Sequence, residues 1–345
     1  MNKHGGYYGN KKNILDFSVN INPLKTPEKT IENIKKYATK LHKYPEIEGK
    51  TGKKIIANNL GIDTKKVILG NGAIELIYLF ARAFKPKKVL IIQPTFNEYE
   101  RAFKLVNSEI FHFQRDEKSG FNIDVEKLSN YIDKVKPDTV ILCNPNNPTA
   151  TYTEKEKFKR VLEKIKNNNS YLFLDESFID FSNKESFIEL TQKYPIFIIR
   201  SMTKYFAVPG IRLGFGIGNK KIINSLNKYK EPWTINTIAL NTISELLNDD
   251  SYIKKTKEWY LKEKEYMNEK LKEIKNINYY KSNTNFYLCK TDITSKKLKD
   301  KLINKNINIR TCEDFYGLEN NHFRICIKNR LENEYLINQL NLILN

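Results

Sequence analysis

Cysteine and histidine are scarce in this chain of 345 residues, with four of each. The cysteines form no close pair with the spacing of metal ligands, and a chain of this length does not need disulfides to hold a core. They are Cys143, Cys289, Cys312 and Cys326. We therefore expect reduced, buried thiols and no metal site. Three of the histidines, at positions 42, 112 and 322, belong to no constellation and are expected to be structural.

Long apolar runs are absent as well, and none is long enough to span a bilayer. The N-terminal stretch MNKHGGYYGNKKN lacks the apolar core of a secretory signal. The sequence therefore predicts a soluble, cytoplasmic protein without a membrane partner.

Positive charge is in excess, because 59 Lys and Arg stand against 40 Asp and Glu, a net charge of +19. Such an excess can indicate a nucleic-acid partner. However, the sequence contains no compact basic tract and no known nucleic-acid module, and the charge is spread over expected helix faces. We expect no nucleic-acid partner, and a positive field suits a small anionic substrate.

Short apolar runs alternate with amphipathic stretches through the middle of the chain. The expected strands cover 87–93, 109–113, 138–144, 170–176 and 195–201. The expected helices cover 97–106, 124–135 and 153–166. This alternation predicts an α/β domain with a mainly parallel sheet.

The character changes after about residue 235, where two helical stretches at 235–248 and 251–275 lead into short strands and a last helix. These elements predict a smaller α+β domain. We predict an N-terminal arm over residues 1–44 that packs with the small domain and over the active site, a large domain over 45–235 and a small C-terminal domain over 236–345. No flexible linker separates them, which indicates a cleft between domains.

The segment SMTKYFAVPGIRLGFGIG at 201–218 follows an expected buried strand. Desolvation at a strand end would lower the pKa of Lys204 and make it a usable amine nucleophile. Ser201 and Arg212 would supply a hydroxyl and a guanidinium for a phosphate. A Ser-x-x-Lys sequence alone is also found in surface turns, but together with Arg212 it favours a cofactor site.

Three further segments suit the same chemistry. Asp175 ends an apolar strand, where a carboxylate that caps the next loop is common, but a protonated pyridine nitrogen would also stabilise it. Asn147 lies in a proline-rich turn and can hydrogen-bond a phenolic oxygen, although Asn-Pro turns are frequent. Gly72 and Ala73 precede an apolar helix whose N-terminal N–H groups can bind phosphate.

The candidate residues follow one another in a characteristic order: Gly72, Ala73, Asn147, Asp175, Ser201, Lys204 and Arg212. This ordered set resembles the fold-type-I pyridoxal-phosphate enzymes of the aminotransferase class I/II group, and the resemblance covers nearly the whole chain. It implies pyridoxal 5'-phosphate held as a Schiff base on Lys204, and a homodimer with active sites at the subunit interface. It also implies that Phe96 stacks on the pyridine ring and that Tyr44 reaches the cofactor phosphate of the neighbouring subunit.

Two branches of this group act on phosphorylated amines: the histidinol-phosphate aminotransferases and the threonine-phosphate decarboxylases of cobalamin biosynthesis. The N-terminal HGG with LDFSVNINPL, EPWTINTIA at 231–239 and INIRTCEDFYGLENNHFRICIK at 307–328 resemble the decarboxylases. Phe178 stands where aminotransferases of the group usually carry a tyrosine. We therefore expect a lyase that converts L-threonine O-3-phosphate to (R)-1-amino-2-propanol phosphate. An aminotransferase acting on histidinol phosphate or a related substrate is the alternative, and serine phosphate as the preferred substrate stays open.

Substrate residues are expected in the small domain and the arm. Arg310 and Arg324 lie on neighbouring strand-like runs, and in so basic a chain both are also compatible with exposed strand positions. The resemblance assigns Arg324 to the substrate carboxylate and Arg310 to its phosphate. It also implies that His4, Gly5 and Asn20 complete the phosphate pocket from an N-terminal arm folded over the cleft, and that Asn147 is a further substrate contact. Ala150 follows the Asn-Pro-Thr turn where the family usually has glycine, and a positive φ there would strain alanine by about 1 kcal/mol.

Overall fold

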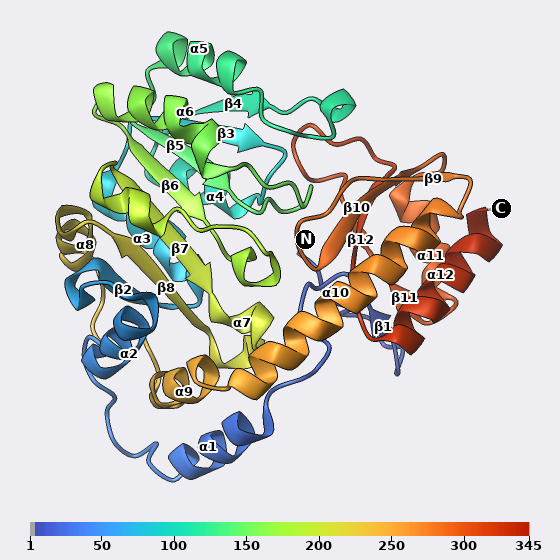
Figure 1. Cartoon of the computed structure of the whole chain (residues 1–345), viewed down its shortest axis with the longest axis horizontal. Helices are drawn as coiled ribbons and strands as arrows, with labels where there is room; N and C mark the ends of the chain where they lie inside the picture. The colour runs from blue at the N-terminus through green and yellow to red at the C-terminus, as the bar shows by residue number, and fades with distance from the viewer. Residues whose placement is uncertain (1–3, 345) are drawn as a thin grey trace.

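The structure, a computed structural model, describes residues 4–344. Its larger part is built on a seven-stranded sheet of order β2-β8-β7-β6-β5-β3-β4, in which β8 is antiparallel to its neighbours and the other pairs are parallel (Figure 1). The strands are β2 (Val67–Asn71), β3 (Lys88–Gln93), β4 (Glu109–Gln114), β5 (Thr139–Cys143), β6 (Tyr171–Asp175), β7 (Ile196–Ser201) and β8 (Leu213–Gly218). The five strands expected from the sequence agree with these bounds to within one residue. The mainly parallel sheet is confirmed.

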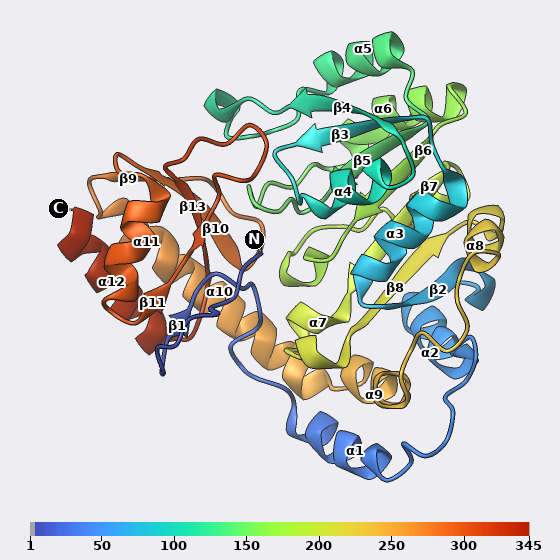
Figure 2. The ribbon, with the colours of Figure 1, turned by 180° about the vertical axis from the view of Figure 1, so that it is seen from behind.

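Helices cover both faces of the large sheet (Figure 2). Alternate strand residues face opposite sides, so Ile141 and Phe173 pack toward one group of helices while Leu142 and Leu174 pack toward the other. The first group contains α3 (Ala73–Phe84), α4 (Glu98–Lys104) and α8 (Lys220–Asn227). The second contains α2 (Lys50–Leu60), α5 (Val125–Val135), α6 (Lys155–Asn167) and α9 (Thr237–Leu247). The strands are buried on both faces, which explains why they read as continuous apolar runs.

A four-stranded antiparallel sheet of order β12-β13-β10-β9 forms the centre of the smaller part. Its strands are β9 (Ile277–Tyr279), β10 (Phe286–Thr291), β12 (Arg310–Thr311) and β13 (His322–Cys326). The helices beside it are α10 (Asp250–Lys272), α11 (Ser295–Ile303) and α12 (Arg330–Leu344). The long helix α10 runs from the neighbourhood of α9 to this sheet (Figures 1 and 2).

The N-terminal segment joins the two parts. β1 (Leu15–Asp16) pairs in parallel with β11 (Ile307–Asn308), which fixes the start of the described chain to the small domain. The run INIRTC is divided between two sheets, because β11 pairs with β1 while β12, which follows it, pairs with β13. Farther along, α1 (Glu28–Ala38) packs against α9. α9 follows residue 235, yet it also contacts α2 beside the large sheet. The domain limits at 44/45 and 235/236 stay predictions.

None of the helices between residues 4 and 344 has both the length and the apolar character needed to cross a membrane.

Candidate active site

A cavity of about 620 Å³ lies between the two sheets, where β5, β6 and β7 end and the small domain and the N-terminal segment approach. Its wall contains nearly all of the residues that the sequence singles out: His4, Gly5, Asn20, Ala73, Phe96, Asn147, Asp175, Ser201, Lys204, Arg212, Arg310 and Arg324. Gly72 lies directly behind this wall, against Arg212. Tyr44 does not reach the cavity.

Lys204 belongs to the single-turn helix α7 (Met202–Tyr205), directly after β7. Its Nζ donates a hydrogen bond to Oγ of Ser201 over 3.1 Å and lies 5.4 Å from the centre of the Phe178 ring. Burial lowers the pKa of Lys204, with a partial opposing effect from Asp175. The side chain is thus an amine on the cavity wall that loses its proton more easily than an exposed lysine, as a nucleophilic amine requires.

Asp175 presents a buried carboxylate to the cavity and is only 6% exposed. Oδ2 accepts a hydrogen bond from the Tyr99 hydroxyl at 2.7 Å, and Oδ1 accepts one from the Ser177 amide at 2.7 Å. Burial, reinforced by Asp175, raises the pKa of Tyr99 well above its usual value, so the hydroxyl stays a donor. Within residues 4–344 no cationic side chain forms an ion pair with Asp175, and a protonated pyridine nitrogen would supply the missing positive charge.

A candidate phosphate cradle lies at the N-terminus of α3. Gly72 caps the helix with φ +72° and no side-chain hydrogen bond, and a Cβ on it would lie 2.4 Å from Nη2 of Arg212. Ala73 follows it on the cavity wall, where its helix end faces Ser201 and Arg212. An uncapped helix N-terminus with a guanidinium and a hydroxyl suits a phosphate dianion. The residues present therefore fit the phosphate of the expected cofactor.

The Asn-Pro-Thr turn adds one further contact to this wall. Oδ1 of Asn147 accepts a hydrogen bond from Nη1 of Arg324, so the turn is joined to the small domain at the cavity. Ala150 adopts φ 57° and is fully buried, which confirms that this position requires a positive φ. Its carbonyl accepts a hydrogen bond from the Asn283 amide at 2.8 Å, a second link between the turn and the small domain.

The two candidate substrate arginines lie on the neighbouring strands β12 and β13, and the register of the sheet places them directly opposite each other. Arg324 is only 6% exposed, donates from Nη2 to the Ser18 carbonyl at 2.7 Å, and has an Nε without a hydrogen-bond partner. Burial lowers the pKa of Arg324 to about 10. Within residues 4–344 it forms no ion pair with a carboxylate. Arg310 instead pairs with Asp314 at 2.7 Å.

The N-terminal segment covers the substrate side of the cavity. Nε2 of His4 lies 3.0 Å from Oε1 of Glu98, and Gly5 lies so close to the Ser18 carbonyl that a Cβ would approach it to 2.3 Å. Asn20 is buried, and among residues 4–344 its amide oxygen has no hydrogen-bond partner. All three candidate arm residues therefore lie on the wall that also carries Arg324.

Several cavity residues were missed by sequence reasoning, notably Tyr78, Asn97, Glu98 and Arg101. The last three follow Phe96 in the segment FNEYER, which the sequence presents only as the start of an amphipathic helix. The turn after β3 is what brings them to the cavity. The sequence feature that could have indicated them is their position directly after Phe96, which is expected to stack on the cofactor.

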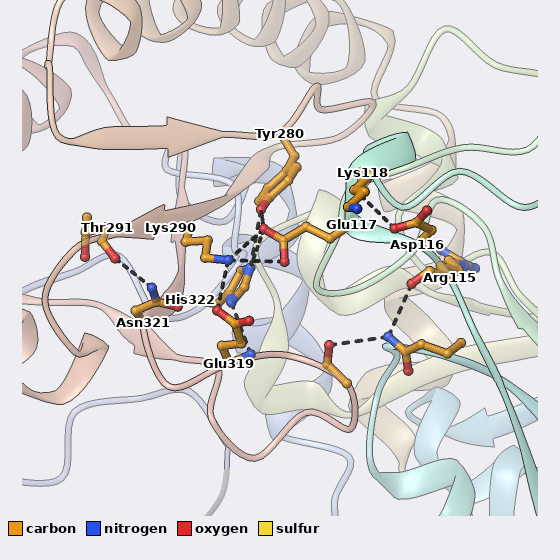
Figure 3. A network of polar contacts seen from close by, with 12 residues as sticks. Arg115, Asp116, Glu117, Lys118, Tyr280, Lys290, Thr291, Glu319, Asn321 and His322 are labelled. Atoms are coloured by element: carbon orange, nitrogen blue, oxygen red, sulfur yellow. Dashed lines mark hydrogen bonds and ion pairs between the residues drawn. The ribbon is translucent and has the colours of Figure 1, made fainter.

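Polar contacts beside the cavity hold the small domain against the large one (Figure 3). Glu117, in the short 3-10 helix Glu117–Ser119, accepts hydrogen bonds from the Tyr280 hydroxyl at 2.6 Å and from Nζ of Lys290 at 2.9 Å. Lys290 also pairs with Glu319 at 2.9 Å, and the Glu319 amide donates to Nδ1 of His322 at 3.2 Å. Because β13 carries both His322 and Arg324, this network helps to fix Arg324 at the cavity.

Tyr44 lies apart from these groups, 86% exposed, with its ring 5.5 Å from that of Trp233. It lines a separate hollow of about 340 Å³. Its expected contact with the neighbouring subunit's cofactor stays a prediction.

A buried lysine, a carboxylate without a cation and a phosphate cradle, all at the carboxyl ends of a mainly parallel sheet, define a fold-type-I enzyme that uses pyridoxal 5'-phosphate. The chain belongs to the class I and II aminotransferase family, whose sequence model matches residues 12–340. It is 41% identical to a provisionally named threonine-phosphate decarboxylase of Caldanaerobacter subterraneus subsp. tengcongensis, over 98% of this chain and 93% of that protein. It is 32% identical to an L-serine phosphate decarboxylase of Campylobacter jejuni subsp. jejuni, over 83% of this chain and 76% of that protein.

Among solved structures, the histidinol-phosphate aminotransferase of Clostridium acetobutylicum superposes with a TM-score of 0.89 at 35% identity, covering 95% of this chain and 98% of that one. The expected fold type and cofactor are thereby confirmed, and both decarboxylases and aminotransferases are among the relatives.

Proposed function

We propose that this enzyme decarboxylates L-threonine O-3-phosphate to (R)-1-amino-2-propanol phosphate and that it serves cobalamin biosynthesis. The observation that carries the proposal is Arg324, a buried guanidinium on the cavity wall without a carboxylate partner among residues 4–344. Arg310 lies beside it on the next strand. Two cationic groups suit a substrate with two anions, an α-carboxylate and a phosphate.

The decarboxylation replaces the bond between the α-carbon and the carboxylate by a bond to a proton, and carbon dioxide leaves. Pyridoxal phosphate, when bound, supplies an electron sink that weakens the α-carbon bond standing perpendicular to its ring. Arg324 and Arg310 would fix the substrate at both anions and thereby choose which bond takes that position. Asp175 would hold the proton on the pyridine nitrogen, and Nζ of Lys204 would return a proton to the α-carbon.

An aminotransferase acting on histidinol phosphate is the second candidate, supported by the overall likeness to the aminotransferase from Clostridium acetobutylicum. Histidinol phosphate carries a phosphorylated hydroxymethyl group in place of the α-carboxylate, so it offers one anionic group to the pair Arg324 and Arg310, whereas threonine phosphate offers two. Phe178 lies beside Lys204 and has no hydroxyl with which to hydrogen-bond the cofactor. Both features favour the decarboxylase.

A product assay with threonine phosphate distinguishes the two reactions. With 2-oxoglutarate present as a possible acceptor of the amino group, we expect release of carbon dioxide and an amino alcohol phosphate from the purified holoenzyme, without formation of a keto acid from threonine phosphate. Keto-acid formation without carbon dioxide, or turnover of histidinol phosphate with 2-oxoglutarate, would refute the decarboxylase. Serine phosphate belongs in the same assay, because one relative is named for that substrate; we expect threonine phosphate to have the higher kcat/KM.

We further propose that the enzyme works as a homodimer in the cytoplasm. Large apolar side chains are exposed around Tyr44: Leu41, Tyr44, Ile47 and Trp233. The Trp233 main-chain amide donates to the Ile47 carbonyl at 3.1 Å, and its ring lies 5.5 Å from that of Tyr44, so these three residues lie together. A second copy covering this surface would bring Tyr44 toward the partner's active site. Sedimentation of the holoenzyme tests the proposal, and a monomer at assay concentration would contradict it.

A further inference from the structure

Glu98 places a negative charge on the wall of a cavity that is expected to bind anions. It lies at the start of α4, and its side chain is 9% exposed. A buried carboxylate close to a substrate phosphate would repel it unless neighbouring groups neutralise the charge. The proposed reaction does not explain why a carboxylate lies at this position, so we consider which groups contact Glu98.

Both oxygens of Glu98 have partners, from three separate parts of the chain. Oε2 accepts a hydrogen bond from the Tyr78 hydroxyl on α3 at 2.5 Å. Oε1 lies 3.0 Å from Nε2 of His4 in the N-terminal segment and 3.5 Å from Nη1 of Arg101. Burial and then Glu98 raise the pKa of Tyr78 to about 12, so this hydroxyl donates at neutral pH. Tyr78 thus fixes the carboxylate from behind, and the other oxygen is aimed at His4.

The same contact fixes the arm over the cavity. On the far side of His4, the Gly6 amide donates to Oγ of Ser18 at 2.7 Å, and the Ser18 carbonyl accepts from Arg324. The segment that carries His4 is therefore held at two points, to the large domain through the His4 imidazole and Glu98, and to the arm and small domain through Gly6 and Ser18. Its ring centre lies 5.8 Å from that of Phe96, the residue expected over the cofactor.

We propose that Glu98 is a positioning residue that holds the His4 imidazole at the phosphate end of the substrate pocket. Recognition of the phosphate then depends on a carboxylate that does not itself touch it. The guanidinium of Arg101, which also lies against Glu98, offsets its negative charge and weakens its repulsion of the substrate. The proposal rests on the proposed function, because it takes His4 as a ligand of the substrate phosphate.

The test combines Glu98→Gln, His4→Gln and the double variant, assayed as holoenzymes. Glu98→Gln keeps an acceptor for Tyr78 but loses the charge that holds His4. We expect kcat/KM for threonine phosphate to fall roughly 10-fold in each single variant, mainly through KM, and little further in the double variant, because residues that act together are not additive. The loss on unphosphorylated threonine, which has no phosphate for His4 to bind, should be clearly smaller in Glu98→Gln.

Glu100→Gln is the matched control, because Glu100 lies on the same helix, pairs with Lys104 at 2.6 Å and does not line the cavity. It should behave as wild type. An equal loss on both substrates, additive losses in the double variant, or no loss in Glu98→Gln would overturn the proposal. If Glu98→Gln does not fold, Tyr78→Phe takes its place and should give a smaller loss that is again confined to threonine phosphate; no loss there would equally overturn it.

Calorimetric binding of inorganic phosphate to the holoenzymes separates this proposal from the proposed function. A wild-type enzyme that binds phosphate but releases no carbon dioxide from threonine phosphate would refute the decarboxylase alone. Phosphate binding weakened by Glu98→Gln and not by Glu100→Gln would still support the role of Glu98. Equal phosphate binding by both variants would contradict it whatever the reaction.

Discussion

Replacement of Arg324 by glutamine tests whether its guanidinium binds the substrate carboxylate. The variant loses the positive charge but keeps an amide that can donate hydrogen bonds toward Asn147 and the Ser18 carbonyl, the two partners that Arg324 now has. Neither Lys204 nor the phosphate cradle contacts Arg324 directly. We therefore expect Arg324→Gln to bind the cofactor and fold normally but to lose turnover.

The pKa of Arg324 sets the expected magnitude. A fall from 12.5 to about 10 means that burial disfavours the charge by about 3 kcal/mol, at about 1.4 kcal/mol per pKa unit. A carboxylate that pairs with the guanidinium relieves much of this penalty. A charge-assisted contact in a dry site is worth about 2–4 kcal/mol, so kcat/KM should fall roughly 30- to 1000-fold. Because the lost charge is buried without a counterion, the melting temperature should change little.

The assay compares threonine phosphate with threonine. Arg324→Gln should impair both substrates, in kcat as well as KM, because the angle of the carboxylate to the cofactor ring is no longer fixed. Arg310→Gln should impair threonine phosphate far more than threonine, because its assigned partner is the phosphate. Arg160→Gln, an exposed position on α6, serves as the control. Unchanged kcat/KM in Arg324→Gln would refute the carboxylate assignment, and an Arg310 variant without a shift in preference would remove the main argument for a phosphorylated substrate.

Three further predictions concern the cofactor and the domain contacts. The wild-type enzyme should be yellow, and borohydride should attach the cofactor to Lys204, as mass spectrometry of the digest would show; Lys204→Ala should lose turnover by several orders of magnitude, and a fully active variant is incompatible with the assignment. Asp175→Asn should retain its fold by circular dichroism but lose most of its kcat, because an amide cannot stabilise the protonated pyridine; near-normal activity would mean that another carboxylate has this role. Burial lowers the pKa of His322 below its usual 6.5, so the unfolded state binds the proton more readily, and the contribution of His322 to stability is complete above about pH 6.5 and is lost as the pH falls below it. Burial alone would raise the pKa of Glu117, but hydrogen bonds from Tyr280 and Lys290 lower it, so its contribution is lost at still lower pH. Urea unfolding between about pH 7.5 and 5 should therefore show a decrease in stability that is smaller in His322→Gln, and identical slopes would contradict this explanation.

The fold could be predicted from the sequence because each strand and helix is indicated by the residue pattern within its own short segment. Strands such as β5 and β6 read as continuous apolar runs; Asp175 is the last residue of one of them, and Asn147 and Lys204 each follow one. In a mainly parallel sheet the carboxyl ends of such strands meet at one edge, so the convergence of these residues on one cavity was foreseeable.

Contacts between distant loops could not be predicted in the same way. Nδ2 of Asn97 donates to the carbonyl of Asp314 at 3.0 Å across a separation of 217 residues, and nothing periodic in either segment indicates it. The pair formed by His4 and Glu98 has the same origin. The division of 307–312 between two sheets depends on pairing with β1, which is only two residues long. These contacts depend on how two domains and an arm meet, which a one-dimensional pattern does not encode.

The hydrogen bond between Asn147 and Arg324 has a consequence for how the enzyme can be observed. Asn147 is expected to contact the phenolic oxygen of the cofactor, and it also accepts from the guanidinium that is expected to bind the substrate carboxylate. A carboxylate that draws Arg324 toward itself competes with this amide and changes the hydrogen bonding of the chromophore. The visible spectrum of the enzyme should then act as an intrinsic optical probe, which responds to simple carboxylates that cannot react. The occupancy of the carboxylate site could thus be followed in a spectrophotometric titration, without turnover.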